Sequence, residues 1–69
     1  MIIKIYKEGC NKYELFNSII DFIVAANEFY HKYCIFDDDY DTNYTIVSFE
    51  EARRVYEMEN YTIEIIGLI

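Results

Sequence analysis

Apolar residues follow a strand-like pattern at the start of the chain and a helix-like one after it. Residues 2–6 form a β-branched run closed by a turn at residues 7–9, which predicts a strand. From residue 12 to residue 33 apolar side chains recur at helical spacing, which predicts a long amphipathic helix. Asn11, with Glu14 three residues later, resembles a capping box and places the start of this helix there. The stripe expected to face the core comprises Leu15, Ile19, Phe22, Ile23, Ala26, Phe29, Tyr30 and Tyr33, with Phe16 at its margin.

The second half of the chain alternates short strand-like runs with one more helix. Residues 33–36 (Tyr-Cys-Ile-Phe) and 44–47 (Tyr-Thr-Ile-Val) each predict a short strand. Ser48, with Glu51 three residues later, forms a second capping box and opens a helix that is expected to end near residue 59. Residues 61–69 then close the chain as a strand whose successive side chains face opposite ways.

This order of elements predicts an α+β protein with the ferredoxin-like β-α-β-β-α-β sandwich, in which two helices cover one face of a small antiparallel sheet. If residues 33–36 are loop instead, a three-stranded sandwich with the same two helices remains. With no Pro and two Gly the chain contains no linker, so residues 1–69 are expected to form a single domain. Ile2, Ile66 and Leu68 are expected on the uncovered sheet face, where they predict contact with a partner or with a second copy in a homodimer.

The most polar stretch is an acidic run between the two predicted middle strands, at residues 37–44. Its carboxylates repel one another and lose hydration on burial, so the run is expected to be an exposed loop. The loop is also longer than a tight turn requires, which is typical of loops that carry function. Tyr40 and Tyr44 within it are expected to act as anchors for a partner, because Tyr is enriched at interface hot spots. The acidic residues of the run are Asp37, Asp38, Asp39 and Asp41.

Three further carboxylates are expected on the polar side of the first helix. Glu14, Asp21 and Glu28 are seven residues apart, so each would lie about 10.5 Å beyond the last along nearly one line. Together with the acidic run they predict a regular negative surface that could enter a groove built to hold nucleic-acid phosphates. The alternative is a solvated acidic face that only maintains solubility.

Net charge narrows the classes of partner. The chain carries 13 acidic and 6 basic residues, for a formal net charge of −7. Direct binding of nucleic acid or of an anionic membrane needs clustered Lys and Arg, and the basic residues here are scattered, so neither is expected. A basic, nucleic-acid-binding protein is the expected partner. No apolar stretch approaches the roughly 18 residues that would span a bilayer.

Cysteine usage and the N-terminal sequence predict a cytoplasmic protein. Cys10 and Cys34 are too few for the disulfide framework of a small secreted domain, and residues 1–7 lack the apolar length of a signal peptide. Neither thiol belongs to a CxxC motif, and both are expected to fill the core.

The sequence carries no constellation typical of an enzyme. It has no glycine-rich phosphate loop, no nucleophile elbow and no metal-binding spacing of His and acids. His31, the single histidine, is expected to be solvated at the rim of the first helix rather than to act as a base. We therefore expect a protein without catalytic residues, cofactor or metal.

One segment resembles a calcium-binding EF-hand loop. Counting from Asp39, acidic or amide residues occupy the first, third and fifth places, and Glu50 occupies the twelfth. The sixth place, where the sharp turn calls for Gly, is taken by Tyr44, and the segment also overlaps the predicted strand at residues 44–47. A calcium module is therefore the third hypothesis for this chain.

In size, acidity, richness in Tyr and Ile and lack of a catalytic motif, the chain resembles the small proteins with which bacteriophages and mobile elements block host defence, including anti-CRISPR proteins and other DNA mimics. The resemblance covers the whole chain and is compositional, so it assigns no role to particular residues. It implies binding to a host nucleic-acid enzyme such as a CRISPR nuclease, in the host cytoplasm, and occlusion of its DNA or RNA site.

Two functions are expected ahead of the calcium module. The first is a non-enzymatic inhibitor that docks its acidic surface into the nucleic-acid groove of a host protein. The second is a small structural or regulatory interaction module that self-associates or binds a partner through its sheet face.

Overall fold

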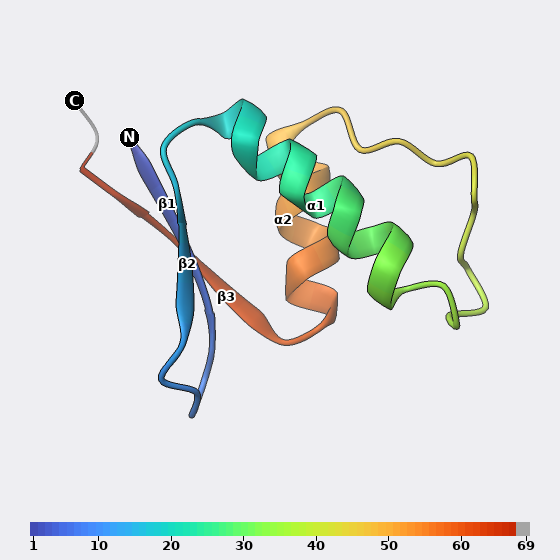
Figure 1. Cartoon of the computed structure of the whole chain (residues 1–69), viewed down its shortest axis with the longest axis horizontal. Helices are drawn as coiled ribbons and strands as arrows, with labels where there is room; N and C mark the ends of the chain where they lie inside the picture. The colour runs from blue at the N-terminus through green and yellow to red at the C-terminus, as the bar shows by residue number, and fades with distance from the viewer. Residues whose placement is uncertain (68–69) are drawn as a thin grey trace.

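The computed structural model describes residues 1–67, which form a three-stranded antiparallel sheet with two helices packed on one of its faces (Figure 1). The strand order is β2-β1-β3, so the first strand of the chain is the central one. The α+β class is confirmed, whereas the ferredoxin-like topology is wrong. The elements are β1 (Ile2–Lys7), β2 (Tyr13–Phe16), α1 (Ile19–Tyr33), α2 (Phe49–Met58) and β3 (Tyr61–Ile66).

The register of the sheet separates a covered face from an open one. Ile3 and Ile5 of β1 are buried beneath the helices, and they lie opposite Ile65 and Ile63 of β3. Residues directly opposite one another in a sheet share a face. Ile63 and Ile65 therefore face the helices, whereas Ile2 and its partner Ile66 lie on the uncovered face, as expected from the sequence. Leu68, which was expected there too, lies outside the described residues.

The first departure from the predicted topology concerns residues 12–18, which are not helical. Residues Tyr13–Phe16 pair with β1 as strand β2, with Tyr13 opposite Tyr6 and Phe16 opposite Ile3. Leu15 is consequently 52% exposed instead of buried in a helix stripe. The sequence has a helical pattern here, but the segment forms a hairpin instead, which gives β1 a second hydrogen-bonded neighbour. Gly9, at φ 82°, supplies the left-handed residue in the connecting turn.

Helix α1 begins after Ser18, whose Oγ accepts a hydrogen bond from the backbone N–H of Asp21 at 3.1 Å. Ser at this position satisfies one of the N–H groups that the first turn leaves without a partner, so Ser18 replaces Asn11 as the N-cap. The predicted stripe is confirmed in part: Phe22, Ala26 and Phe29 are buried and Ile23 and Tyr30 pack against them, whereas Ile19 and Tyr33 are exposed.

The two predicted middle strands do not form. Residue Cys34 is the C-cap of α1 and donates its backbone N–H to the carbonyl of Tyr30, and the next turn is closed by a bond from the N–H of Asp37 to the carbonyl of Cys34. Residues 33–36 therefore end a helix. Residues 44–47 are extended without a strand partner, because Ile46 is bonded to a side chain of α1 instead.

Helix α2 agrees with the sequence. Ser48 caps it by accepting a hydrogen bond from the N–H of Glu51 at 3.2 Å, and its own Oγ–H donates to the Glu51 carboxylate at 3.1 Å. Asn60, at φ 69°, turns the chain from α2 into β3. Asn tolerates this left-handed conformation better than most residues.

The core lies between the sheet and the helices and is rich in aromatic rings. Phe22 is fully buried, and its ring centroid lies 5.5–5.6 Å from those of Phe16, Phe49 and Tyr56. Tyr56 also meets the ring of Phe29 edge to face at 4.6 Å. Aromatic pairs at these distances add stabilisation beyond the area they bury. Neither helix formed by residues 1–67 is long and apolar enough to cross a membrane.

Candidate functional site

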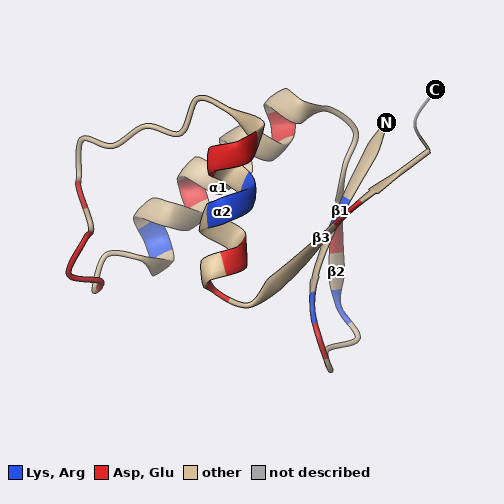
Figure 2. Cartoon of the chain, turned by 180° about the vertical axis from the view of Figure 1, so that it is seen from behind, with Lys and Arg blue, Asp and Glu red and all other residues tan. Residues whose placement is uncertain are grey.

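The acidic run lies in the α1–α2 loop, residues 35–47, which carries it to the end of the molecule away from the sheet (Figure 2). Two consecutive turns shape the run. The N–H of Tyr40 donates to the carbonyl of Asp37, and the N–H of Tyr44 donates to the carbonyl of Asp41, both at 3.1 Å. The carboxylate of Asp41 also accepts from the N–H of Asn43 at 2.9 Å, which is an Asx turn. Asp37, Asp38, Asp39 and Asp41 are all exposed, as expected.

Asn27 of α1 holds the distal arm of this loop. Its side-chain N–H donates to the carbonyl of Ile46 at 2.9 Å, and its side-chain oxygen accepts from the N–H of Ile46 at 2.7 Å. The amide thus pairs with the Ile46 backbone as a neighbouring strand would. The Ile46 side chain is 1% exposed and packs in the core. Backbone groups this close to the core need partners, and Asn27 supplies both.

His31 joins two points of the loop to α1, so the expectation of a solvated histidine is wrong. Its Nε2 lies 2.9 Å from the carbonyl oxygen of Tyr44 and its Nδ1 lies 2.8 Å from the hydroxyl of Tyr40. A carbonyl only accepts, so Nε2 carries the proton, and in the neutral ring Nδ1 accepts from the Tyr40 hydroxyl. His31 is half-buried, both of its ring nitrogens are hydrogen-bonded, and it therefore holds the loop against α1.

The two tyrosines predicted as partner anchors face inward. The ring of Tyr40 stacks on that of Tyr30 with centroids 5.2 Å apart, and the Tyr30 hydroxyl accepts from the N–H of Asp41 at 3.0 Å. Tyr44 donates its hydroxyl to the Glu51 carboxylate of α2 at 2.6 Å. That hydrogen bond is the main cause that raises the pKa of the Tyr44 phenol, with burial next. Both rings therefore shape the loop and offer a partner little surface.

The loop instead presents apolar residues that the sequence had placed in strands. Phe36 is 89% exposed, next to the aspartates, and Val47 is 72% exposed on the returning arm. An aromatic residue that is this exposed beside a charged cluster resembles the anchor and rim of a protein interface. The sequence signal for it was present, because Phe36 directly precedes Asp37, but the strand prediction assigned it to the sheet.

The predicted line of three carboxylates does not exist, because Glu14 is in β2 and not in a helix. Asp21 lies in the first turn of α1, where a negative charge favours the helix N-terminus. Glu28 lies two turns further on, on the side of α1 that faces β2. The structure thus separates Asp21 from the acidic loop and places Glu14 and Glu28 at a common groove.

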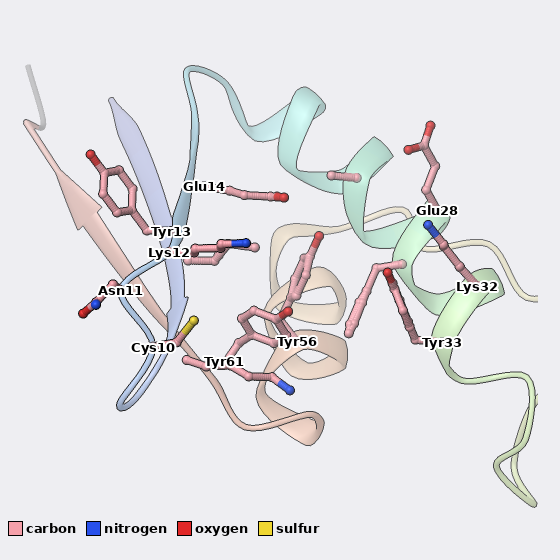
Figure 3. A pocket seen from close by; sticks show the side chains of 14 residues that line it. Cys10, Asn11, Lys12, Tyr13, Glu14, Glu28, Lys32, Tyr33, Tyr56 and Tyr61 are labelled. Carbon is pink, nitrogen blue, oxygen red and sulfur yellow. The ribbon is translucent and has the colours of Figure 1, made fainter.

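This groove, with a volume of about 740 Å3, runs between the β1–β2 hairpin and the C-terminal half of α1 (Figure 3). The rings of Phe29, Tyr56 and Tyr61 line it, and the labelled side chain of Glu14 points into it from β2. Burial is the main cause that raises the pKa of Tyr56, and the carboxylates of Glu14 and Glu28 raise it further. Burial, followed by Glu14, likewise raises the pKa of Tyr61.

Lysines balance the acids of the groove. Lys7, Lys12 and Lys32 also line it, and the Nζ atoms of Lys7 and Lys32 lie 5.1 and 5.3 Å from the ring centroids of Tyr61 and Tyr33. Such cation–π contacts occupy the rings that a cationic ligand would need. The groove is therefore mixed in charge.

The calcium hypothesis finds no support among the described residues. The Asp41 carboxylate is used in the Asx turn, and Glu50 forms an ion pair with Arg53 at 2.6 Å in α2. Tyr44 does not adopt the positive φ that the sixth place requires, since Asn60 is the non-glycine residue of positive φ within residues 1–67.

Cysteine placement agrees with the sequence for one thiol and not for the other. Cys34 is buried, whereas Cys10 is exposed at the groove rim. Within residues 1–67, the single cluster with three potential metal ligands joins Cys34 with Asp37 and Glu59, whose ligand atoms lie within 4.8 Å of one another. Burial first, and then the charges of Glu59 and Asp37, raise the pKa of the Cys34 thiol.

Comparison of the chain with protein-family models, with curated proteins and with solved structures gives no match.

Proposed function

We propose that this protein is a non-enzymatic inhibitor that docks the tip of its α1–α2 loop onto the basic nucleic-acid groove of another protein. The observation that carries the proposal is a set of four exposed carboxylates, on Asp37, Asp38, Asp39 and Asp41, in a loop that hydrogen bonds join to α1. A loop held in one shape loses little conformational freedom on binding, so more of its interaction energy appears as affinity. Negative charges on it also steer it toward basic surfaces.

The hydrogen bonds between α1 and the loop favour an inhibitor over an acidic face that only maintains solubility. Solubility requires charge but no fixed shape. Here three side chains of α1, Asn27, Tyr30 and His31, hold the loop backbone at residues 41, 44 and 46. The loop is also longer than the roughly two to eight residues that usually join packed helices.

Phe36 gives the acidic tip an apolar contact of its own. Charged residues set the rate and orientation of association, while buried aromatic residues supply much of the affinity. The partner class that fits this combination is a protein with a basic groove lined in part by apolar side chains, such as a CRISPR nuclease or another nucleic-acid-processing host protein.

The test compares how strongly two variants of equal net charge bind purified CRISPR nucleases loaded with guide RNA. In the loop variant, Asp37, Asp38, Asp39 and Asp41 become Asn, which changes the net charge from −7 to −3 by removing four carboxylates. In the control variant, Glu8, Glu14 and Glu28 become Gln and Asp21 becomes Asn, which gives the same net charge and leaves the loop intact.

The expected result, measured by biolayer interferometry at low and physiological salt, is that the loop variant binds at least tenfold more weakly and loses most of its salt dependence. The control variant keeps near-native affinity, and excess duplex DNA displaces the wild-type protein. Equal loss in both variants would mean that net charge, and not the loop, drives binding. A panel in which no nuclease binds the wild-type protein would remove this class of partner.

A further inference from the structure

The face of the sheet away from the helices carries mostly apolar side chains. By register, Ile2 of β1 lies beside Ile66 of β3, and Tyr6 of β1 lies beside Tyr13 of β2. Tyr13 is 58% exposed and Ile66 is 43% exposed. We call this surface the outer face, and it comprises Ile2, Lys4, Tyr6, Tyr13, Leu15, Thr62, Glu64 and Ile66.

Charge distinguishes the outer face from the rest of the molecule. Of the strand residues that the structure describes, this face carries Lys4 and Glu64 as its charged members, so its net charge is zero in a chain of net charge −7. The two residues are directly opposite each other in the β1–β3 register. Two copies of a strongly acidic protein repel each other least through a surface that carries no net charge.

The charged pair is also held in place within one copy. The Tyr6 hydroxyl donates to the Glu64 carboxylate at 2.7 Å. The Lys4 Nζ lies 5.3 Å from the ring centroid of Tyr6 and 4.9 Å from that of Tyr13. Side chains fixed by their own neighbours lose little further freedom when a partner covers them.

We propose that the outer face binds a second copy of this chain in a two-fold symmetric dimer. A two-fold axis that lies in the interface, parallel to the strands and midway between β1 and β3, exchanges the positions of these two strands. It therefore places Lys4 of one copy over Glu64 of the other, and the reverse. The same axis lays Ile2 of each copy over Ile66 of the other. An axis running along β1 would instead stack Lys4 on its own copy, so the charges select the first arrangement.

Surface area sets the strength of this dimer. Six-residue strands rise about 3.3 Å per residue and lie about 4.8 Å apart, so the overlapping part of the face measures roughly 20 Å by 10–14 Å. That footprint, about 200–280 Å2 per copy, is smaller than the roughly 800 Å2 per partner of a standard specific interface, so the dimer is expected to be weak. The dimer is accordingly reversible and forms at high micromolar protein concentration, and it leaves the α1–α2 loops of both copies free.

The test is charge reversal in two separate variants, followed by mixing. Lys4→Glu gives each outer face two negative charges, and Glu64→Lys gives each face two positive charges. Sedimentation velocity up to about 1 mM is expected to show that each variant alone dimerises at least tenfold more weakly than wild type. An equimolar mixture of the two is expected to form a heterodimer again, because the opposite faces now complement each other.

Several outcomes would overturn the proposal: a wild-type protein that stays monomeric at 1 mM, reversed variants that dimerise as wild type does, or a mixture that does not associate. A wild-type monomer would leave the outer face to a different protein.

A second pair of variants covers the case in which charge reversal impairs folding. Ile66→Asn is expected to weaken dimerisation at least tenfold, whereas Ile19→Asn, at a residue of similar exposure (38% against 43%) in α1, is expected to leave it unchanged. Equal effects of the two substitutions would also contradict the proposal.

Discussion

The sheet with its helices and the α1–α2 loop are held together by different forces. In the body, Ile3, Phe22 and Ala26 are fully buried and the packing is apolar. Of residues 35–47, by contrast, Ile46 is the one buried side chain, and most of the loop is fastened by hydrogen bonds from α1. Apolar packing is distributed over many contacts, whereas the loop depends on a few polar ones. A substitution at one of these polar contacts is therefore expected to loosen part of the loop and leave the body folded.

The largest effect is expected from Phe22→Ala. This substitution removes a fully buried ring that contacts three other aromatic rings, and such changes cost about 3–5 kcal/mol of unfolding free energy. Urea unfolding followed by circular dichroism measures the loss. Phe36→Ala is the matched control, because its ring is 89% exposed and its removal should change stability by less than about 0.5 kcal/mol. Similar losses in both variants would contradict the division between body and loop.

A smaller and local effect is expected from Asn27→Ala. It leaves both the N–H and the carbonyl of Ile46 without their partner, which costs about 1–3 kcal/mol for groups removed from water. Hydrogen exchange should then speed up at residues 44–46, while the amides of β1 keep their protection relative to the reduced global stability. Loss of protection in β1 beyond that global change would show that the loop is part of the cooperative core.

The smallest effect is expected from the ionisation of two tyrosines at alkaline pH, which reports on both the body and the loop. Tyr56 in the body and Tyr44 in the loop have raised pKa values when folded, so the folded state holds these protons more tightly than the unfolded state. Their contribution to stability is present below about pH 10 and is lost as the pH rises above it. In urea unfolding between pH 7 and 11, wild type should weaken above about pH 10, and Tyr56→Phe should show a shallower decline.

Tyr44→Phe sharpens the same measurement. It should cost about 1 kcal/mol at pH 7, because it removes the bond to Glu51, and it should also reduce the alkaline decline. An alkaline decline of wild-type steepness in both variants would mean that other groups control stability at high pH.

Elements with strong local signals were predicted correctly from the sequence. The cap at Ser48 and the span of α2 depend on residues within a few turns of each other, and the strands at β1 and β3 are β-branched runs. The start of α1 was wrong although a local signal existed. Ser18 precedes Asp21 by three residues and resembles a capping box as closely as Asn11 and Glu14 do. Because Tyr13 pairs with Tyr6 in the sheet, the helix cannot begin at Asn11 and begins after Ser18 instead.

The candidate site was predictable in its charge and not in its architecture. Exposure of Asp37 and its neighbours follows from the cost of burying clustered charges. The fastening of the loop depends on pairs such as Asn27 with Ile46, which are 19 residues apart and follow no periodic pattern. For the same reason, the sequence could not show whether the Tyr40 ring packs against α1 or is exposed to a partner.

The position of β1 at the centre of the sheet has a consequence for how the chain acquires its structure. One neighbour of β1 follows within a few residues as a hairpin, but the other is β3, and Ile2 pairs with Ile66. During synthesis the hairpin can close early, while the second edge of β1 stays bare until residues 61–66 have left the ribosome. Contacts of such sequence separation slow folding and leave intermediates prone to aggregation. The three-stranded sheet is therefore expected to form late in folding.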